Sequence, residues 1–259
     1  MTTPPRFFGS ARPTDVDGVI RALEAIVEWA WTTRSRSGYF AQVYLSTTRA
    51  VKEAIDAGEF EASERLARLD LVFALRYLDA FDAFHDGRRP SRSWQMALEA
   101  DRDRSLLVLQ HVLLGMNAHI NLDLGVAAAE VAPGEALAGL RADFDRVNDI
   151  LAGITGRVEV ALGQTSPVFG LLDRLAGAHD AAAIMWSIRA ARRAAWASAE
   201  RLAARSGEEL GVGIDALDSD VALLAWLIVG DPLSREAMAP LRWSEEPETR
   251  AVIEALRGI

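Results

Sequence analysis

Chemically versatile side chains are concentrated in residues 110–123, QHVLLGMNAHINLD, on an almost wholly apolar background. If this segment is an α-helix with about 100° per residue, His111, His119 and Asp123 lie along one polar seam between two apolar stripes. A helix that is apolar on two faces is typically buried in the middle of a bundle. Its polar groups must then be paired or serve a site, so this segment predicts where a functional site lies.

His119 and Asp123 have the i, i+4 spacing at which two side chains reach one group, and two kinds of chemistry fit it. They could hold a divalent metal ion, with zinc the first candidate, together with a ligand from another helix. Alternatively, Asp123 could fix the tautomer of His119 for acid–base catalysis without a cofactor. His111 lies about 12 Å further along a regular helix. It would share an ion with His119 only if the helix were distorted at Gly115, and otherwise it is expected to face a different part of the same cavity.

Five further residues are candidates for contact with a substrate or for support of the catalytic groups. Three lie on the predicted helix at about 61–85, and two lie on a second polar seam of the central segment: Asp70, Arg76, Tyr77, Asn117 and Asn121. The two asparagines are amides four residues apart, and such buried amides more often join helices by hydrogen bonds than bind a substrate. Arg192, on a later helix rich in small residues, is expected to pair with a buried acid, either Asp143 or Asp70.

The aspartates of residues 79–86, DAFDAFHD, resemble the magnesium-binding motif of terpene cyclases. The second motif of those enzymes can be tested at Asn148 and Asp149, but Ala152 and Gly156 stand where a hydroxyl and a carboxylate are needed. Magnesium–diphosphate chemistry is therefore disfavoured. The aspartates near the end of this helix are expected to be solvated charges.

Hydrophobic periodicity and capping signals predict an all-α fold. Helices are expected at about 14–33 (with Thr14 as N-cap), 39–57, 61–85, from 94, 105–131, 135–154, from 167, 180–205, 213–229 and 249–256. Residues 157–162 alternate like a strand but are flanked by glycine, so more helix or a crossing segment is expected there, and 240–247 is expected to be a loop. The prediction is a tail or arm at 1–13 and a single domain at 14–259, a bundle of about ten helices around a central buried helix at about 105–131.

Composition excludes several classes of function. The 259-residue chain is half hydrophobic, carries a formal charge of −9 and has no cysteine. The absence of cysteine excludes disulfides and thiolate chemistry, and the acidic balance argues against nucleic-acid binding. Lys52 is the only lysine and lies on a polar helix face, which disfavours Schiff-base chemistry. No signal peptide or membrane span is predicted, so a cytoplasmic protein is expected; the oligomeric state is open, with a homodimer compatible.

The segment 111–125, HVLLGMNAHINLDLG, resembles an uncharacterised, mostly actinobacterial helical family, the domain-of-unknown-function family 5995. The resemblance extends from about Tyr39 to Trp196 and rests on the motif His-x3-Gly-x3-His-x-Asn-x-Asp-Leu, on residues 69–81 and on residues 143–148. It implies an α-helical fold and names no reaction. A weaker similarity links the chain to the zinc-dependent phospholipase C and P1 nuclease group, but Met116 replaces the aspartate that follows the glycine in that group.

Together these patterns predict a non-redox enzyme that acts on a small, partly apolar molecule, in a role that fits secondary metabolism. Hydrolysis, elimination or cyclisation would use His119 and Asp123 as acid–base or metal-binding groups, with His111 as a third catalytic residue. One alternative is a metal-free cyclase or isomerase of the terpene or polyketide type. The other is a non-catalytic protein that binds a small molecule or a partner, in which the polar seams only fix the register of the helices.

Overall fold

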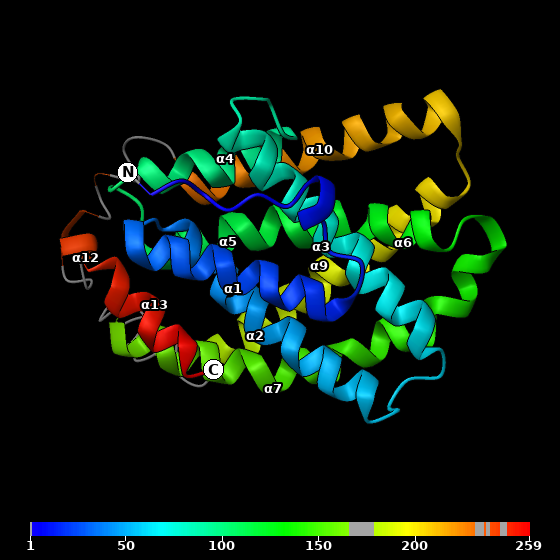
Figure 1. Cartoon of the computed structure of the whole chain (residues 1–259), viewed down its shortest axis with the longest axis horizontal. Coiled ribbons are helices and arrows are strands. Elements are labelled where there is room, and N and C mark those ends of the chain that lie inside the picture. The colour runs from blue at the N-terminus through cyan, green and yellow to red at the C-terminus, as the bar shows by residue number, and fades with distance from the viewer. Residues whose placement is uncertain (1, 166–178, 231–235, 237–238, 244–247) are drawn as a thin grey trace.

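Helices account for all the regular secondary structure in the part of the chain that the structure describes (Figure 1). The structure is a computed structural model, and it describes residues 2–165, 179–230, 236, 239–243 and 248–259. No strand is present within these ranges, which confirms the predicted all-α class.

The first half of the chain forms helices close to the predicted ranges. They are η1 (Gly9–Ala11), α1 (Val16–Thr33), α2 (Ser37–Asp56), α3 (Ser63–His85), α4 (Arg92–Glu99) and η2 (Ala100–Arg102). The start of α1 differs from the prediction, because Asp15 rather than Thr14 is the N-cap. The carboxylate of Asp15 accepts a hydrogen bond of 2.6 Å from the backbone N–H of Gly18, one of the N–H groups that the helix itself cannot satisfy.

The second half departs further from the prediction. Its elements after the central helix are η4 (Gly134–Leu140), α7 (Arg141–Thr165), α9 (His179–Ala203), α10 (Gly207–Val229), α12 (Ala239–Trp243) and α13 (Thr249–Arg257). The helix expected at 135–154 begins instead as 3-10 helix, and α7 runs on through 157–162, which confirms that the alternating segment is helical. The helix expected from Pro167 begins outside the described residues. The expected loop at 240–247 overlaps α12, and its residues 244–247 also lie outside them.

A continuous helix runs through the middle of the bundle and changes its winding along its length. It consists of α5 (Val108–Met116), the π-helical segment η3 (Asn117–Leu124) and α6 (Gly125–Val131). In Figure 1 it lies between one group of helices, α4 and α10, and another that contains α1, α2, α7 and α13. Helices α2, α3, α4, α9 and α10 all pack against parts of it, which confirms a buried central helix.

The stretch Val108–Val131 is long and apolar enough to cross a membrane by length and composition. In this fold, however, 78% of its most apolar window is buried inside the protein. A helix surrounded by other helices needs apolar side chains on most of its circumference. Packing inside the bundle therefore accounts for the composition of this helix.

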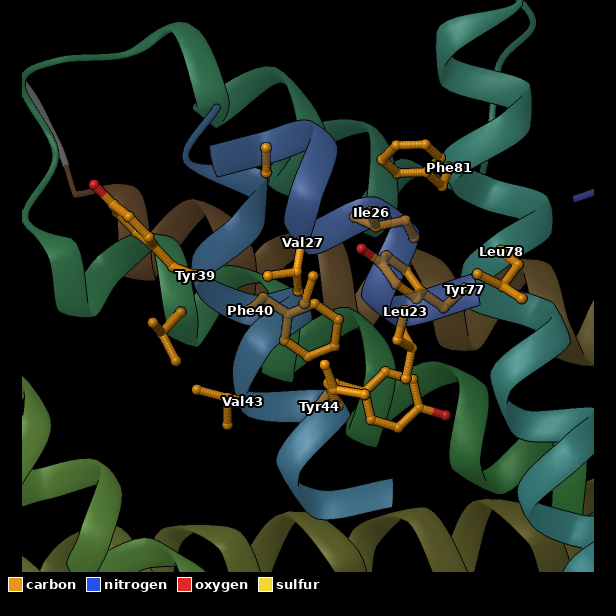
Figure 2. Packing of buried hydrophobic residues seen from close by; sticks show 14 of the residues in the cluster. Leu23, Ile26, Val27, Tyr39, Phe40, Val43, Tyr44, Tyr77, Leu78 and Phe81 are labelled. Atoms are coloured by element: carbon orange, nitrogen blue, oxygen red, sulfur yellow. The ribbon is translucent and has the colours of Figure 1, made fainter. Parts of the chain in front are cut away.

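Aromatic and branched side chains fill the space where α1, α2 and α3 meet (Figure 2). Phe40 of α2 lies at the centre, with its ring 5.3 Å from the ring of Tyr77 on α3. The same ring also packs against Gly115 of α5, where an added Cβ would lie 2.4 Å from Cγ of Phe40. Gly115 thus allows α2 to approach the central helix closely, directly before the π-helical segment begins.

Candidate functional site

The π-helical segment η3 presents His119 and Asp123 to the interior of the bundle. Both side chains are almost fully buried, at 3% and 1% exposure for the two residues. π-helical turns are rare and frequently occur at functional sites, because they shift side chains out of the regular α-helical register. The structure therefore shows a distortion just after Gly115, as the sequence allowed, although it does not bring His111 to His119.

Asp123 is held by donors from two other helices. Its Oδ1 accepts a 2.9 Å hydrogen bond from Nε of Arg76 on α3, and its Oδ2 accepts one of 2.7 Å from the indole Nε1 of Trp94 on α4. Nδ1 of His119 lies 3.9 Å from Oδ2, beyond hydrogen-bond range, so the carboxylate acts on the imidazole through its charge. Asp123 is thus an ion-paired group that joins three helices.

His119 is enclosed by aromatic rings. The ring of Phe73 stacks on its imidazole with a centroid distance of 3.6 Å, and the ring of Tyr44 meets it edge-on at 4.2 Å. Both ring nitrogens are buried and have no hydrogen-bond partner among the described residues. Burial lowers the pKa of His119, and the charge of Asp123 opposes this effect. The imidazole is therefore neutral at pH 7, with two nitrogens available to a ligand.

Tyr44, Phe73 and His119 line a cavity of about 100 Å³ between α2, α3, η3, α7 and α9, which we call the His119 cavity. Most of its wall is apolar. The polar groups in its wall are contributed by Tyr44, Thr47, Asp70, His119 and Arg192. A mainly apolar cavity with a few convergent polar groups is the usual form of a small-molecule site.

Asp70 is the carboxylate of this cavity. Its Oδ2 is buried and has no hydrogen-bond partner among the described residues, although the residue as a whole keeps intermediate exposure. Burial raises the pKa of Asp70 to about 7. The hydroxyl of Tyr44 is likewise buried without a partner, and burial together with the charge of Asp70 raises the pKa of Tyr44. Asp70 can therefore exchange a proton near neutral pH, which an ordinary aspartate does not do.

Arg192 of α9 supplies a buried positive charge to the wall of this cavity. Its Nε donates to Oδ1 of Asn148 at 2.7 Å, and its Nη2 donates to the carbonyl oxygen of Phe144 at 2.5 Å. Burial lowers the pKa of Arg192 to about 10. No carboxylate within the described ranges pairs with it, so the expected ion pair is wrong. Asp143 instead accepts hydrogen bonds from the backbone N–H groups before α3, and Asp70 is unpaired.

Comparison with known proteins gives a match to a family model. A family model described as a family of unknown function (DUF5995) matches residues 16–231. The chain belongs to this family. No curated protein and no solved structure matches the chain. The match confirms the resemblance expected from residues 111–125, and nothing among the matches supports the similarity to phospholipase C and P1 nuclease.

In this DUF5995 chain, the remaining predicted residues lie away from the His119 cavity. Arg76 is bound to Asp123, and Tyr77 packs between Phe40 and Trp94. Nδ2 of Asn117 donates to the carbonyl oxygen of Val221 on α10 at 2.9 Å, and Nδ2 of Asn121 donates to Oδ1 of Asn117. The two asparagines therefore join η3 to α10, as amides at this spacing were expected to do.

His111 lies outside the His119 cavity. It lines a larger cavity at one end of the bundle and a small one between α2, α4 and α5. The prediction that it faces another part of the same cavity is therefore not met, because the ring of Phe40 and the close contact at Gly115 lie between the two regions.

A metal ion at His119 and Asp123 finds little support in the donor set. Within the described ranges no three His, Cys, Asp or Glu side chains are grouped so that they could hold an ion. Both carboxylate oxygens of Asp123 already accept hydrogen bonds, one of them from an arginine. The pair would thus need a third ligand from outside these residues, together with a rearrangement of Arg76 and Trp94.

The aspartates of residues 79–86 do not form a magnesium site either. Asp79 pairs with Arg12, Asp86 pairs with Arg6, and Oδ2 of Asp82 accepts the backbone N–H of Phe7 at 3.0 Å. Asp82 is only 2% exposed, so the expectation that it is a solvated helix-end charge is wrong. These groups fasten the N-terminal segment to α3.

Tyr44 and Arg192 were not predicted as site residues from the sequence. Tyr44 lies in an ordinary hydrophobic pattern, and only the structure shows its ring against His119 in the cavity that Asp70 also lines. Arg192 carried a partial signal, since an arginine among alanines on a packed helix is expected to be buried. Its lack of a carboxylate partner became visible only once the helices were assembled.

Proposed function

We propose that this protein is a non-redox enzyme that transfers protons on a small, largely apolar molecule bound in the His119 cavity. One observation carries the proposal. Asp70 and His119 line the same apolar cavity, both have buried polar atoms without a hydrogen-bond partner, and burial shifts both pKa values toward or below neutrality. Groups with such shifts cluster at catalytic sites, because a general acid or base works best near the pH at which it acts.

The roles follow from the charges. Asp70 would remove or deliver a proton, since its protonated and ionised forms are both populated near pH 7. The neutral imidazole of His119 would serve as the second proton donor or acceptor. Arg192, which has no carboxylate partner among the described residues, would stabilise a carboxylate of the substrate or the oxyanion of an enolate. Asp123, with Arg76 and Trp94, would act as a positioning residue for His119.

Elimination, isomerisation and cyclisation all need a proton removed at one atom and delivered at another, and two such groups that line one cavity provide for this. These classes include the cyclases and isomerases of secondary metabolism. An apolar cavity of about 150 Å³ accommodates benzene. The smaller volume here suits the reacting end of a substrate.

The second candidate is a protein that binds an apolar molecule without chemistry. The stacking of Phe73 on His119 favours it, because a packed imidazole can serve as a flat wall for a ligand. The two candidates differ in whether Asp70 and His119 exchange protons with the ligand. An experiment on proton exchange therefore separates them.

The experiment uses two probes with acidic C–H bonds, phenylpyruvate and cyclohex-3-enone, in D₂O. Proton NMR follows the loss of the acidic protons. We expect exchange above the buffer rate, reduced about 100-fold or more in His119→Gln and Asp70→Asn, the range usual for loss of a general acid or base. His85→Gln is the matched control, because His85 is a partly buried histidine whose pKa is also lowered by burial, and it does not line this cavity.

A second measurement does not depend on the choice of probe. NMR titration of the Asp70 carboxyl and the His119 imidazole gives their protonation states in the free protein. A pKa near 4 for Asp70, or a protonated His119 at pH 7, would refute acid–base catalysis here. Saturable binding of either probe without any exchange would instead support the binding protein.

A further inference from the structure

A second cavity, lined by arginines, opens at the end of the bundle where the α1–α2 loop, the start of α5, the end of α12 and the start of α13 meet. Its volume is about 700 Å³, within the range usual for small-molecule sites. The arginines in its wall are Arg34, Arg36, Arg104 and Arg242. We call it the arginine cavity. It shares no lining residue with the His119 cavity.

The described part of this wall is positively charged, whereas the whole chain is negatively charged. The protein carries a formal charge of −9, yet Glu248 is the one carboxylate in the described part of the wall, against four guanidinium groups. Glu248 pairs with Arg34 at 3.5 Å. A local excess of positive charge attracts an anion to this cavity. The acidic remainder of the protein surface disfavours non-specific binding of polyanions.

Three of the four arginines in the wall, Arg36, Arg104 and Arg242, make no ion pair with a carboxylate of the described residues. Nη1 of Arg36 donates to the backbone oxygen of Asp101 at 3.1 Å, and Nη1 of Arg242 donates to the backbone oxygen of Arg104 at 3.0 Å. Bonds to neutral carbonyl groups position these side chains without cancelling their charge. The exposed guanidinium of Arg104 has no hydrogen-bond or ion-pair partner among the described residues.

The loop that carries two of the arginines is held in a fixed conformation. Oδ1 of Asp101 accepts hydrogen bonds from the hydroxyl of Ser35 at 2.8 Å and from the backbone N–H groups of Arg36 and Ser37. Arg34 has a φ of +59°, the left-handed region that favours glycine, and no other non-glycine residue in the described ranges has a positive φ. Groups fixed before binding lose less entropy when a ligand arrives.

A buried histidine and two aromatic residues, one buried and one exposed, also line the wall. His111 is 7% exposed, and its Nε2 is buried with no hydrogen-bond partner among the described residues. Tyr39 packs edge-on against it at 6.0 Å, and Figure 2 shows Tyr39 directed away from Tyr44, which lines the His119 cavity. Trp243 is 76% exposed at the rim and offers a flat aromatic face. The wall thus combines cations, one unpaired buried imidazole and an aromatic surface.

We infer that the arginine cavity binds a phosphorylated small molecule of about nucleotide size. Four guanidinium groups exceed what one carboxylate requires, whereas a phosphate chain accepts several charge-assisted hydrogen bonds from arginine. The volume leaves room for an organic portion beside the phosphates, and Trp243 could stack on a ring in that portion. This inference concerns a site separate from the proposed catalytic cavity and does not depend on it.

The test is isothermal titration calorimetry of the intact protein with pyrophosphate, ATP and citrate at physiological salt. We expect saturable binding of pyrophosphate and ATP, with citrate at least tenfold weaker. Arg104→Gln and Arg242→Gln should each weaken pyrophosphate about tenfold, the effect of losing one charge-assisted hydrogen bond of about 1.4 kcal/mol. Trp243→Ala should weaken ATP and leave pyrophosphate unchanged.

Arg102→Gln is the matched control, because Arg102 is exposed, lies two residues from Arg104 and does not line the cavity. It removes the same charge, so a loss equal to that in Arg104→Gln would show general attraction and overturn the inference. Absence of saturable binding of both phosphates, or citrate binding as tight as pyrophosphate, would also overturn it. His119→Gln should bind pyrophosphate and ATP like the wild type. The outcome of this test therefore does not depend on the outcome of the proton-exchange test.

Discussion

His119 and His111 lie eight residues apart on one helix, and both have a buried ring nitrogen without a hydrogen-bond partner among the described residues, yet their surroundings are opposite. His119 faces aromatic rings and one carboxylate, Asp123, whereas His111 faces a cavity lined by arginines. Burial lowers both pKa values. Asp123 opposes the effect of burial at His119. At His111 the charge of Arg36 adds to burial while the charges of Asp101 and Asp103 oppose it, and the pKa is about 4.

This difference shows how one central helix can serve two kinds of chemistry. Near His119 a low dielectric and few charges favour proton transfer, since small shifts of charge have large energies there. Near His111 several cations at the end of the bundle favour recognition of an anion. The predictions below test how completely the two regions are separated.

The largest expected effect is that of Asp123→Ala on stability. The change would leave the indole N–H of Trp94 and the guanidinium of Arg76 without their acceptor inside the bundle. Removing one partner of a buried ion pair typically costs about 3–5 kcal/mol. Because the side chain of Arg76 is 27% exposed, we expect about 3 kcal/mol in the free energy of unfolding measured with urea.

Asp79→Ala is the control for this prediction. Asp79 also pairs with an arginine, but both side chains are largely exposed, so the loss should be about 0–1 kcal/mol. Equal losses in the two variants would show that Asp123 does not hold the helices around His119 together.

Gly115→Ala tests the boundary between the two regions. The added Cβ would lie 2.4 Å from Cγ of Phe40, so the ring or the helix must move. We expect a loss of about 1–3 kcal/mol from overpacking, which outweighs the gain of about 1 kcal/mol in helix propensity. The measurement is thermal unfolding, supplemented by the near-UV circular dichroism of the aromatic cluster.

Gly153→Ala is the matched control, because nothing lies within 4 Å of a Cβ at that helical position. It should stabilise the protein by about 0.5–1 kcal/mol. If Gly115→Ala stabilised the protein, the ring of Phe40 would be able to move at little cost. It would then not form a fixed boundary between the surroundings of His119 and those of His111.

The sequence predicted the fold and the central helix well, because hydrophobic periodicity reports directly which faces are buried. The burial of His119 and Asp123 in this helix could also be predicted, since both lie between two apolar stripes; their role as site residues stays a prediction. The sequence could not supply the partners of Asp123, because Arg76 and Trp94 come from helices whose relative rotation depends on the whole bundle. The sequence likewise allowed a distortion of the helix at Gly115 but did not predict the π-helical winding of η3.

The arginine cavity was invisible in the sequence for a similar reason. Its four arginines come from three separate parts of the chain, and each is unremarkable among 28 basic residues. Asp82 shows the converse error. It looked like a solvated charge at the end of a helix, but the N-terminal segment folds back so that the backbone N–H of Phe7 reaches its carboxylate.

Asp70→Asn tests the His119 cavity through the pH dependence of stability. The native pKa of about 7 lies above the unfolded value near 4, so the native state binds this proton more tightly. The stability that this group contributes is fully present below about pH 4 and is lost as the pH rises through about 7. Wild-type stability relative to Asp70→Asn should therefore fall by on the order of 2 kcal/mol between about pH 5 and pH 8, measured by urea unfolding.

The stability that His119 contributes changes with pH in the opposite direction. Its pKa is lowered, so its contribution is present above the unfolded value near 6.5 and is lost as the pH falls. Comparing wild type with Asp70→Asn cancels this term. A constant difference across the range would show that Asp70 titrates like an exposed aspartate and that the cavity does not tune it.

The smallest expected effect is that of Arg36→Gln on the two histidines. Arg36 lowers the pKa of His111, and it is not among the causes that shift His119. Removing its charge should raise the pKa of His111 by about half a unit, a typical size for one partly screened neighbour, and leave that of His119 unchanged. NMR titration of the imidazole signals measures both values in one sample.

Arg21→Gln, on the exposed side of α1, controls for the change in net charge. If both histidines respond equally to Arg36→Gln, the charge at the end of the bundle reaches the His119 cavity, and the two regions form one electrostatic unit. If only His111 responds, the ring of Phe40 and the apolar core around it separate a proton-transfer region from an anion-binding region on the same helix. Pyrophosphate, if bound beside Arg36, should then shift His111 in the same direction as the substitution, because an added anion and a removed cation act alike on a nearby imidazole.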